Sequence, residues 1–344
     1  MNTLRQKFLI AALAGSSVLA FAADPYKVTI HTQADDLQGA MVYLVNYDTG
    51  ARIDSTLVDG PETVFAGTIE EPALVRLLID GNRAGTFILE NGSIVLKPEQ
   101  RLAFGSPLND RLNDFNAQVQ KLSDRITPDT PEAESEKVFD EYEALINRTL
   151  EENIDNPIGY YLFINEAGQL SGKDFKDYLA KYPVLARYQR VQKLQEMMGS
   201  RDATQPGNKY LDFSISQPDG KVLKLSDFVK PDKYTLVDFW ASWCGPCIHE
   251  IGTLKSLWEK YHADGRLDIV GVAVWDKPDD TRAAIARYEI PWACILNAQN
   301  IPTDLYGISG IPCIILIGPD GTILSRDKQD AALVADVERF LNEK

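Results

Sequence analysis

The feature that most constrains the fold is a pair of cysteines, Cys244 and Cys247, with a Gly-Pro dipeptide between them. The apolar run at 234–240 predicts a buried strand before the pair, and the run at 248–263 predicts a helix after it. A C-x-x-C pair at a strand-to-helix junction is a redox motif, because two thiols at the first helical turn can close a small disulfide ring. The sequence therefore predicts an α/β domain built around this junction.

The same cysteine spacing also occurs in zinc sites and in structural disulfides. A zinc site needs a second pair of ligands, but Cys294 and Cys313 stand alone and the three histidines lie in no ligand-spaced motif. At a helix N-terminus, unpaired N–H groups favour a thiolate on Cys244. Pro246 fits the first turn, where its missing N–H is not needed. We therefore interpret the pair as redox-active and expect no metal and no bound cofactor.

Residues 238–247, Asp-Phe-Trp-Ala-Ser-Trp-Cys-Gly-Pro-Cys, resemble the active-site segment of thioredoxin. The stretch 207–344, the last two-fifths of the chain, is similar to the TlpA/ResA-like periplasmic thiol–disulfide oxidoreductases. That family implies a thioredoxin-like α/β fold. The order of predicted elements agrees with it: a hairpin at 211–225, a buried strand at 267–274, a helix at 281–288, a short strand at 293–296, a hairpin at 313–325 and a helix at 331–343.

The resemblance implies roles for three residues of the motif. Cys244 is the expected nucleophile that attacks a substrate disulfide, and Cys247 is the expected resolving cysteine. Asp238 matches the buried acid of thioredoxin. Burial on an apolar strand disfavours its charge and raises its pKa, so that it could accept and return the proton of Cys247. The alternative for Asp238 is a solvent-exposed position at a strand end.

The resemblance also implies where a substrate binds. Ile311-Pro312 matches the cis-proline that faces the C-x-x-C pair, and its exposed backbone would pair with a substrate peptide. Trp243, Gly245 and Pro246 complete the expected substrate contact.

Three cysteine and glycine positions depart from the family pattern or stand outside it. Gly252 replaces the proline that usually kinks the active-site helix. Cys313 replaces a threonine after the cis-proline; it could lie near the active sulfurs, but a buried core thiol is the favoured interpretation, as it is for Cys294. If these two cysteines lie on strands three spacings apart, roughly 14 Å separates them and a disulfide between them is excluded.

The N-terminus has the layout of a cleavable secretory signal over residues 1–22. Arg5 and Lys7 precede a short apolar run at 8–13, and Ala-Phe-Ala at 20–22 forms a small-x-small cleavage site. All four cysteines follow residue 243, so the signal is not followed by a lipid-anchoring cysteine. We expect a soluble protein exported to the periplasm.

Residues 25–105 predict an antiparallel β-sandwich or barrel, because short strands alternate with turn signals. Asn91-Gly92 predicts a hairpin between the strands at 86–89 and 93–96. The segment resembles the β-rich domain of unknown function that precedes many TlpA-like proteins. The motifs that carry this likeness are Ile53-Asp54-Ser55, Glu90-Asn91-Gly92 and Gly105-Ser106-Pro107-Leu108-Asn109.

Residues 106–199 have helical periodicity and predict a helical region. Residues 200–208, which contain Gly, Pro, Ser and charges of both signs, predict a linker, and 209–344 is the expected thioredoxin-like domain. A net charge of −15 argues against nucleic acid and anionic membrane surfaces as partners.

The sequence thus predicts a thiol–disulfide oxidoreductase that acts on protein disulfides, favoured as a reductase. A membrane-bound protein would supply its electrons, and cytochrome c maturation is the process that the resemblance suggests. Two alternatives stay open. The chain could be a disulfide isomerase or oxidase, in which a homodimer would present a client cleft. It could also be a ligand- or partner-binding module whose redox centre is vestigial.

Overall fold

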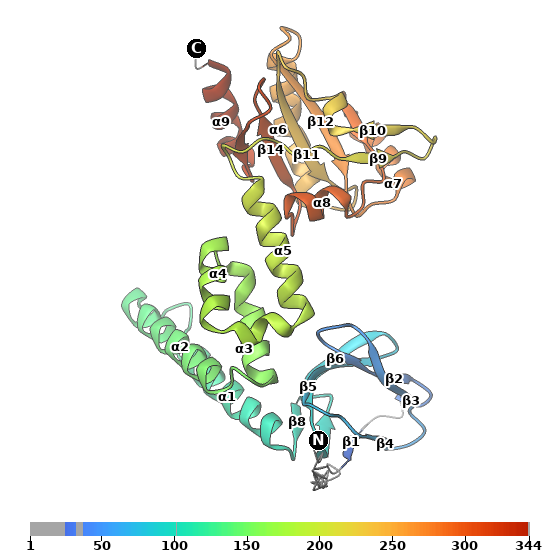
Figure 1. Ribbon diagram of the computed structural model, residues 1–344, viewed down its shortest axis with the longest axis vertical. Coiled ribbons are helices and arrows are strands. Elements are labelled where there is room, and N and C mark those ends of the chain that lie inside the picture. Colours follow the sequence, from blue (N-terminus) through green and yellow to red (C-terminus); the bar gives the residue numbers. More distant parts are fainter. Residues whose placement is uncertain (1–24, 32–36, 101, 343–344) are drawn as a thin grey trace, which may run out of the picture. The chain divides into compact units, whose positions relative to one another are not determined.

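A computed structural model describes residues 25–31, 37–100 and 102–342 of the chain (Figure 1). The predicted signal at 1–22 lies outside these residues. The chain divides into two compact units, Met1–Leu162 and Phe163–Lys344. Among the described residues, no helix is long and apolar enough to span a membrane.

The first unit contains two four-stranded sheets that share one core. The strands are β1 (Tyr26–His31), β2 (Met41–Asn46), β3 (Arg52–Leu57), β4 (Glu62–Gly67), β5 (Ala73–Ile79), β6 (Asn82–Leu89), β7 (Gly92–Lys97) and β8 (Leu102–Phe104). One sheet has the order β4-β1-β7-β8 and the other β3-β2-β5-β6. Alternate side chains of both sheets, such as Val28 and Leu44, are fully buried in the same cluster. The predicted sandwich is confirmed, with one parallel pairing, β1 with β7.

The predicted hairpin at Asn91-Gly92 is wrong. Strands β6 and β7 flank this dipeptide, but β6 pairs with β5 and β7 pairs with β1 and β8, in the other sheet. The side chain of Asn91 explains the difference, because it donates to Ile69 O (2.9 Å) and accepts from Ile69 N (3.3 Å). These long-range bonds hold the connection where the chain crosses between sheets, so a local turn signal was overridden by tertiary contacts.

Helices follow the sandwich, as predicted. They are α1 (Pro107–Ser123), α2 (Glu132–Glu152), α3 (Pro157–Glu166), α4 (Gly172–Lys181) and α5 (Gln189–Ala203).

The expected linker at 200–208 differs from the structure. Helix α5 continues to Ala203, and the next residues pair with the second unit's terminal hairpin: Gly207 N donates to Ile323 O and Ile323 N donates to Asn208 O, each at 2.8 Å. The composition of this stretch is that of a linker, but its backbone is ordered by these bonds.

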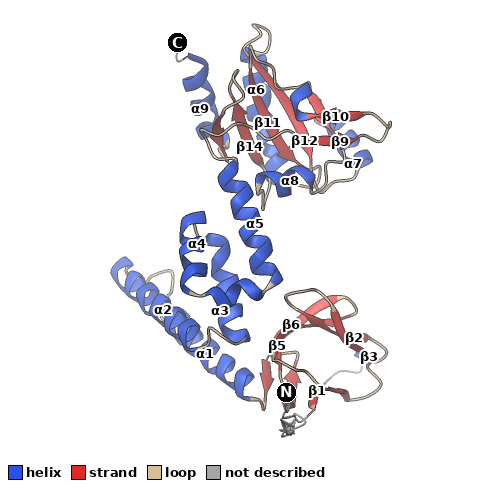
Figure 2. Ribbon diagram, viewed as in Figure 1, coloured by secondary structure: helices blue, strands red, loops and turns tan. Residues whose placement is uncertain are grey.

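The second unit contains a five-stranded sheet covered on both faces (Figure 2). Its order is β13-β12-β11-β14-β15. Strands β11, β12 and β13 are parallel, β14 is antiparallel to β11, and β15 is antiparallel to β14. The strands are β11 (Tyr234–Trp240), β12 (Leu267–Ala273), β13 (Ala293–Ile295), β14 (Cys313–Ile317) and β15 (Ile323–Arg326); the hairpin β9 (Ser214–Ser216) and β10 (Val222–Lys224) precedes them. This is the thioredoxin-like fold that the sequence predicted.

Each face of this sheet has its own core. Helices α6 (Gly245–Tyr261), α7 (Pro278–Arg287) and α9 (Asp330–Asn342) contribute to the core on one face. The β9–β10 hairpin and α8 (Ile301–Tyr306), a helix that the sequence analysis did not predict, contribute to the other. Along β11, Leu236 and Trp240 face α6, whereas Val237 and Phe239 face α8. The side chain of Asp238 therefore lies on the α6 face.

Candidate active site

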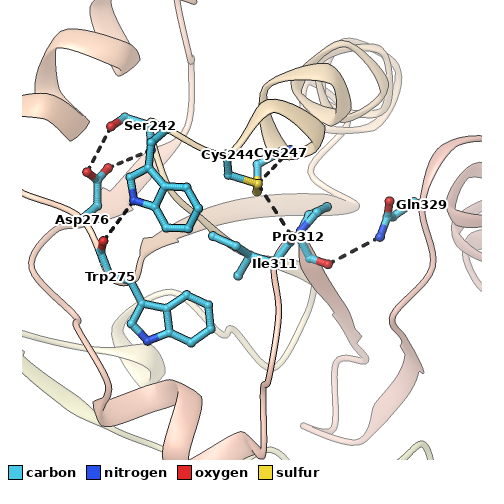
Figure 3. Close-up of a disulfide and its surroundings, with 9 residues drawn as sticks. Ser242, Cys244, Cys247, Trp275, Asp276, Ile311, Pro312 and Gln329 are labelled. Carbon is cyan, nitrogen blue, oxygen red and sulfur yellow. Dashed lines mark hydrogen bonds between the residues drawn. A yellow bond between two sulfur atoms is a disulfide. The ribbon is translucent and has the colours of Figure 1, made fainter. Parts of the chain in front are cut away.

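The two cysteines form a disulfide at the N-terminus of helix α6 (Figure 3). Their sulfur atoms are 2.07 Å apart and their Cα atoms 5.2 Å apart. Cys244 is the N-cap residue, and the backbone N–H of Cys247 donates to its Sγ at 3.2 Å. Pro246 occupies the first turn, as predicted, and Cys244 and Cys247 are 4% and 1% exposed. The helix N-terminus thus directs an N–H at the outer sulfur, which is the arrangement that stabilises a thiolate there.

The segment Ile311-Pro312 lies beside the outer sulfur. The peptide bond between these residues is cis, as the resemblance implied. The carbonyl oxygen of Ile311 is 3.7 Å from Cys244 Sγ, and Gln329 Nε2 donates to the carbonyl oxygen of Pro312 at 3.5 Å (Figure 3). Ile311 and Pro312 are both partly exposed. The structure therefore brings this accessible backbone and the disulfide together.

Asp238 is buried beneath helix α6, which excludes the solvent-exposed alternative. It is 3% exposed, and its Oδ1 has no hydrogen-bond partner within the described part of the chain. Burial, and secondarily the charge of Glu250, raises the pKa of Asp238 to about 8. Glu250 is itself buried, and burial raises its pKa too, although Asp330 N donates to both of its carboxylate oxygens at 3.0 and 3.1 Å. Two carboxyl groups thus share the core that holds Cys247.

Asp276, which the sequence analysis missed, holds the loop next to the disulfide. This residue is 5% exposed and follows strand β12. Its carboxylate accepts from Ser242 N (2.8 Å), Ser242 Oγ (3.0 Å), Lys277 N (2.9 Å) and Thr281 Oγ1 (2.8 Å), and Figure 3 shows the two bonds to Ser242. The available signal was its position at the carboxyl end of a buried parallel strand, where functional groups gather in α/β sheets.

Trp275, the residue before Asp276, contacts Trp243, the exposed tryptophan of the motif. The carbonyl oxygen of Trp275 accepts from Trp243 Nε1 at 3.0 Å, and Trp275 has a left-handed backbone (φ 53°) that few side chains adopt. Trp243 is 62% exposed. Two adjacent residues after β12 therefore fix the two residues that immediately precede Cys244.

Asp276→Ala is expected to lower the free energy of unfolding by about 3 kcal/mol, because hydrogen-bond donors on three residues lose a buried, charged acceptor. Urea titration followed by tryptophan fluorescence measures this. The matched control is Ser242→Ala, which removes only one of the four bonds and should cost about 1 kcal/mol. Equal losses in the two variants would show that Asp276 does not organise this loop.

The remaining cysteines lie on opposite faces of the sheet. Cys294 is on β13 and Cys313 on β14, three strand spacings apart, and both thiols are free. Cys294 packs on the α6 face and Cys313 on the α8 face. The expected exclusion of a Cys294–Cys313 disulfide is confirmed. Cys313 is a buried thiol that points away from the active sulfurs, as the favoured interpretation had it. Helix α6 runs without a break through Gly252.

Comparison with known proteins agrees with this geometry. Residues 206–326 match the AhpC/TSA family, and residues 26–112 match a domain of unknown function, DUF4369. The chain is 23% identical over 128 residues to the thiol-disulfide oxidoreductase ResA of Bacillus subtilis (strain 168), which covers 37% of this chain and 70% of ResA. It is 38% identical over 101 residues to the thiol:disulfide interchange protein CycY of Rhizobium leguminosarum bv. viciae, which covers 29% of this chain and 52% of CycY.

The chain is also similar to a solved structure. The thioredoxin domain of a thiol-disulfide oxidoreductase from Bacteroides vulgatus is 27% identical, with a TM-score of 0.36, over 40% of this chain and 99% of that domain. The chain thus matches DUF4369 in its N-terminal part, and its C-terminal thioredoxin-like domain is similar to thiol–disulfide oxidoreductases.

Proposed function

We propose that this protein reduces disulfide bonds in other proteins by dithiol–disulfide exchange through Cys244 and Cys247. The observation that carries the proposal is the disulfide at the N-terminus of α6, with its outer sulfur 3.7 Å from the accessible backbone of Ile311. A peptide that paired with this backbone would bring its own disulfide to Cys244. The exposed indole of Trp243 supplies an apolar contact next to it.

In the proposed reaction, the Cys244 thiolate attacks one sulfur of the substrate disulfide. A mixed disulfide forms, and the other substrate sulfur leaves as a thiolate that takes a proton from water. Cys247 then attacks Cys244 Sγ, and the first substrate sulfur leaves. The enzyme dithiol has become a disulfide, and the substrate disulfide has become two thiols.

Asp238 is the proposed proton acceptor for the second step. Cys247 must lose its proton before it attacks, and the leaving substrate thiolate must gain one. A buried carboxyl with a pKa of about 8 is matched to both transfers near neutral pH. Asp238 and Cys247 lie on the same face of the sheet, in the core beneath α6.

We further propose that the protein works in the periplasm, where a protein electron donor returns the pair to the dithiol. The basic, apolar and small-residue pattern of residues 1–22 supports export. In an oxidising compartment a reductase needs such a donor, because the surroundings favour its disulfide form. The direction of reduction is supported by the combination of Cys-Gly-Pro-Cys with a buried Asp238.

The test is the reduction potential of the Cys244–Cys247 pair, measured by equilibrating the purified protein in defined thiol/disulfide buffers. We expect a value near that of thioredoxin, about −270 mV. A value between about −180 and −120 mV would overturn the reductase proposal and favour an isomerase or oxidase. Refolding of scrambled ribonuclease, together with the oligomeric state in solution, would then distinguish these two.

A further inference from the structure

The backbone of helix α5 packs directly against the backbone of the thioredoxin-like domain at Gly307. A Cβ atom placed on Gly307, just after α8, would lie 2.2 Å from Met197 O and 2.5 Å from Arg201 N of helix α5. Gly307 also has a left-handed backbone (φ 59°), so a glycine is required here on two grounds. The helix that precedes the domain in the sequence is therefore part of its packed structure.

The buried side chain of Arg326 binds the C-terminal end of helix α5. The side chain of Arg326, at the end of β15, is 2% exposed. Its guanidinium donates to Tyr306 O at 2.8 Å, to Thr204 O at 3.3 Å and to Thr204 Oγ1. Thr204 is the C-cap residue of α5 and is fully buried. A buried charge is retained only where it is well paired, so this network depends on α5 being in place.

The adjacent carboxylate joins helix α5 to the residue that follows Pro312. One oxygen of Asp327, Oδ2, accepts from Arg201 Nη2 of α5 at 2.7 Å and from Arg326 Nε at 3.3 Å. The other oxygen, Oδ1, accepts from the thiol of Cys313 at 3.1 Å. Burial, and secondarily the charge of Asp327, raises the pKa of Cys313 well above its usual value, so the thiol keeps the proton that it donates.

The residues that follow Asp327 contact the active site as well. Asp327 N donates to Ile314 O at 2.9 Å, Gln329 Nε2 donates to Pro312 O at 3.5 Å, and Asp330 N donates to Glu250. Asp327 and Asp330 both have left-handed backbones (φ 59° and 49°), which turn the chain between β15 and α9. The connection between β15 and α9 thus touches α5 on one side and the backbone beside the disulfide on the other.

We propose that Asp327 is a positioning residue through which docking of helix α5 holds the Ile311–Pro312 backbone in its substrate-binding position. The inference rests on the proposed function, because it assigns that backbone to substrate binding. It makes α5 part of the active-site framework. A change in how α5 is held would alter the affinity for a protein disulfide without touching the reacting sulfurs.

The test removes the α5 side of the link with Arg201→Gln in the full-length protein. The assay follows the reduction of insulin by the protein, with dithiothreitol as the electron donor. We expect the KM for insulin to rise about fivefold, the effect of losing one partly exposed ion pair, while kcat stays within about twofold. Lys176→Gln is the matched control. It removes another ion pair of α5, Lys176 with Asp202 (3.0 Å), which does not involve Asp327, and should leave KM unchanged.

A second readout follows the backbone directly. Hydrogen–deuterium exchange should become faster in the peptide that contains residues 308–314 in Arg201→Gln, and not in Lys176→Gln. In a Cys313→Ala background, the Arg201→Gln change should raise KM less than in the wild-type protein, because the Asp327 carboxylate no longer binds the residue that follows Pro312. Faster exchange confined to α5, or an unchanged KM, would overturn the inference. If the wild-type protein does not reduce insulin, the proposed function fails, and the exchange at 308–314 still decides whether α5 holds this backbone.

Discussion

Cys244→Ser is expected to lower the rate of insulin reduction at least about a thousandfold, because a serine hydroxyl is not an effective nucleophile toward a disulfide. The geometry gives no substitute for this atom. Cys244 Sγ is the sulfur that lies 3.7 Å from the carbonyl oxygen of Ile311, whereas Cys247 lies further along helix α6. The assay measures turnover with excess dithiothreitol at a fixed insulin concentration.

The variant Cys247→Ser separates the two steps of the exchange. It keeps the first attack and loses the second, so it should accumulate a mixed disulfide between Cys244 and the substrate, visible on a non-reducing gel and by mass. Cys294→Ser is the matched control: it removes a free thiol on the same face of the sheet and should keep the rate within about twofold. If Cys247→Ser turned over at the wild-type rate, the assignment of the resolving cysteine would be wrong.

The sequence predicted most of the second unit because its signals are local. A continuous apolar run predicted β12, and the strand before Cys244 and the helix after Cys247 were both present where the motif placed them. The acid on the strand was found through its match to the thioredoxin motif, and its apolar neighbours Val237 and Phe239 supported its burial. The structure adds a second buried acid, Glu250 on helix α6. Acids near a helix N-terminus are common on exposed surfaces, so the sequence did not indicate that this one is buried.

The features that the sequence analysis predicted wrongly or missed have a common cause: each depends on contacts between residues that are distant in the sequence. Asn91-Gly92 is a local hairpin signal, yet Asn91 binds Ile69 and the two flanking strands enter different sheets. The composition of 200–208 predicts a linker, yet Thr204 is fully buried and accepts from Arg326, which lies over a hundred positions away in the chain. In the sequence, Asp276 resembles any polar loop residue, and only the fold shows that it accepts a hydrogen bond from Ser242.

The pH dependence of stability follows from the buried acid. The pKa of Asp238 is about 8 in the folded protein and takes its usual value of about 3.8 in the unfolded chain. Between these values the folded state binds one more proton than the unfolded state, so the free energy of unfolding falls as the pH rises. The contribution of Asp238 is fully present below about pH 4 and is lost once the pH has passed about 8.

Asp238→Asn is therefore expected to flatten this decline and to stabilise the second unit at alkaline pH. Since one pH unit corresponds to about 1.36 kcal/mol, the gain at pH 9 is up to about 6 kcal/mol. All five tryptophans lie in the second unit, so urea titrations followed by fluorescence at pH 5, 7 and 9 report on it. Glu250 acts in the same direction, because its pKa is also raised, and some slope should remain in the variant.

The control for this experiment is an aspartate with the opposite shift. Asp219 is exposed, and its pKa is lowered, first by the backbone N–H of Lys221. A group with a lowered pKa loses its contribution only as the pH falls below its usual value, so Asp219→Asn should leave the slope between pH 5 and 9 as it is. If Asp238→Asn kept the wild-type slope as well, Asp238 would be charged throughout this range. It could not then carry the proton of Cys247, and the resolving step would need another acceptor.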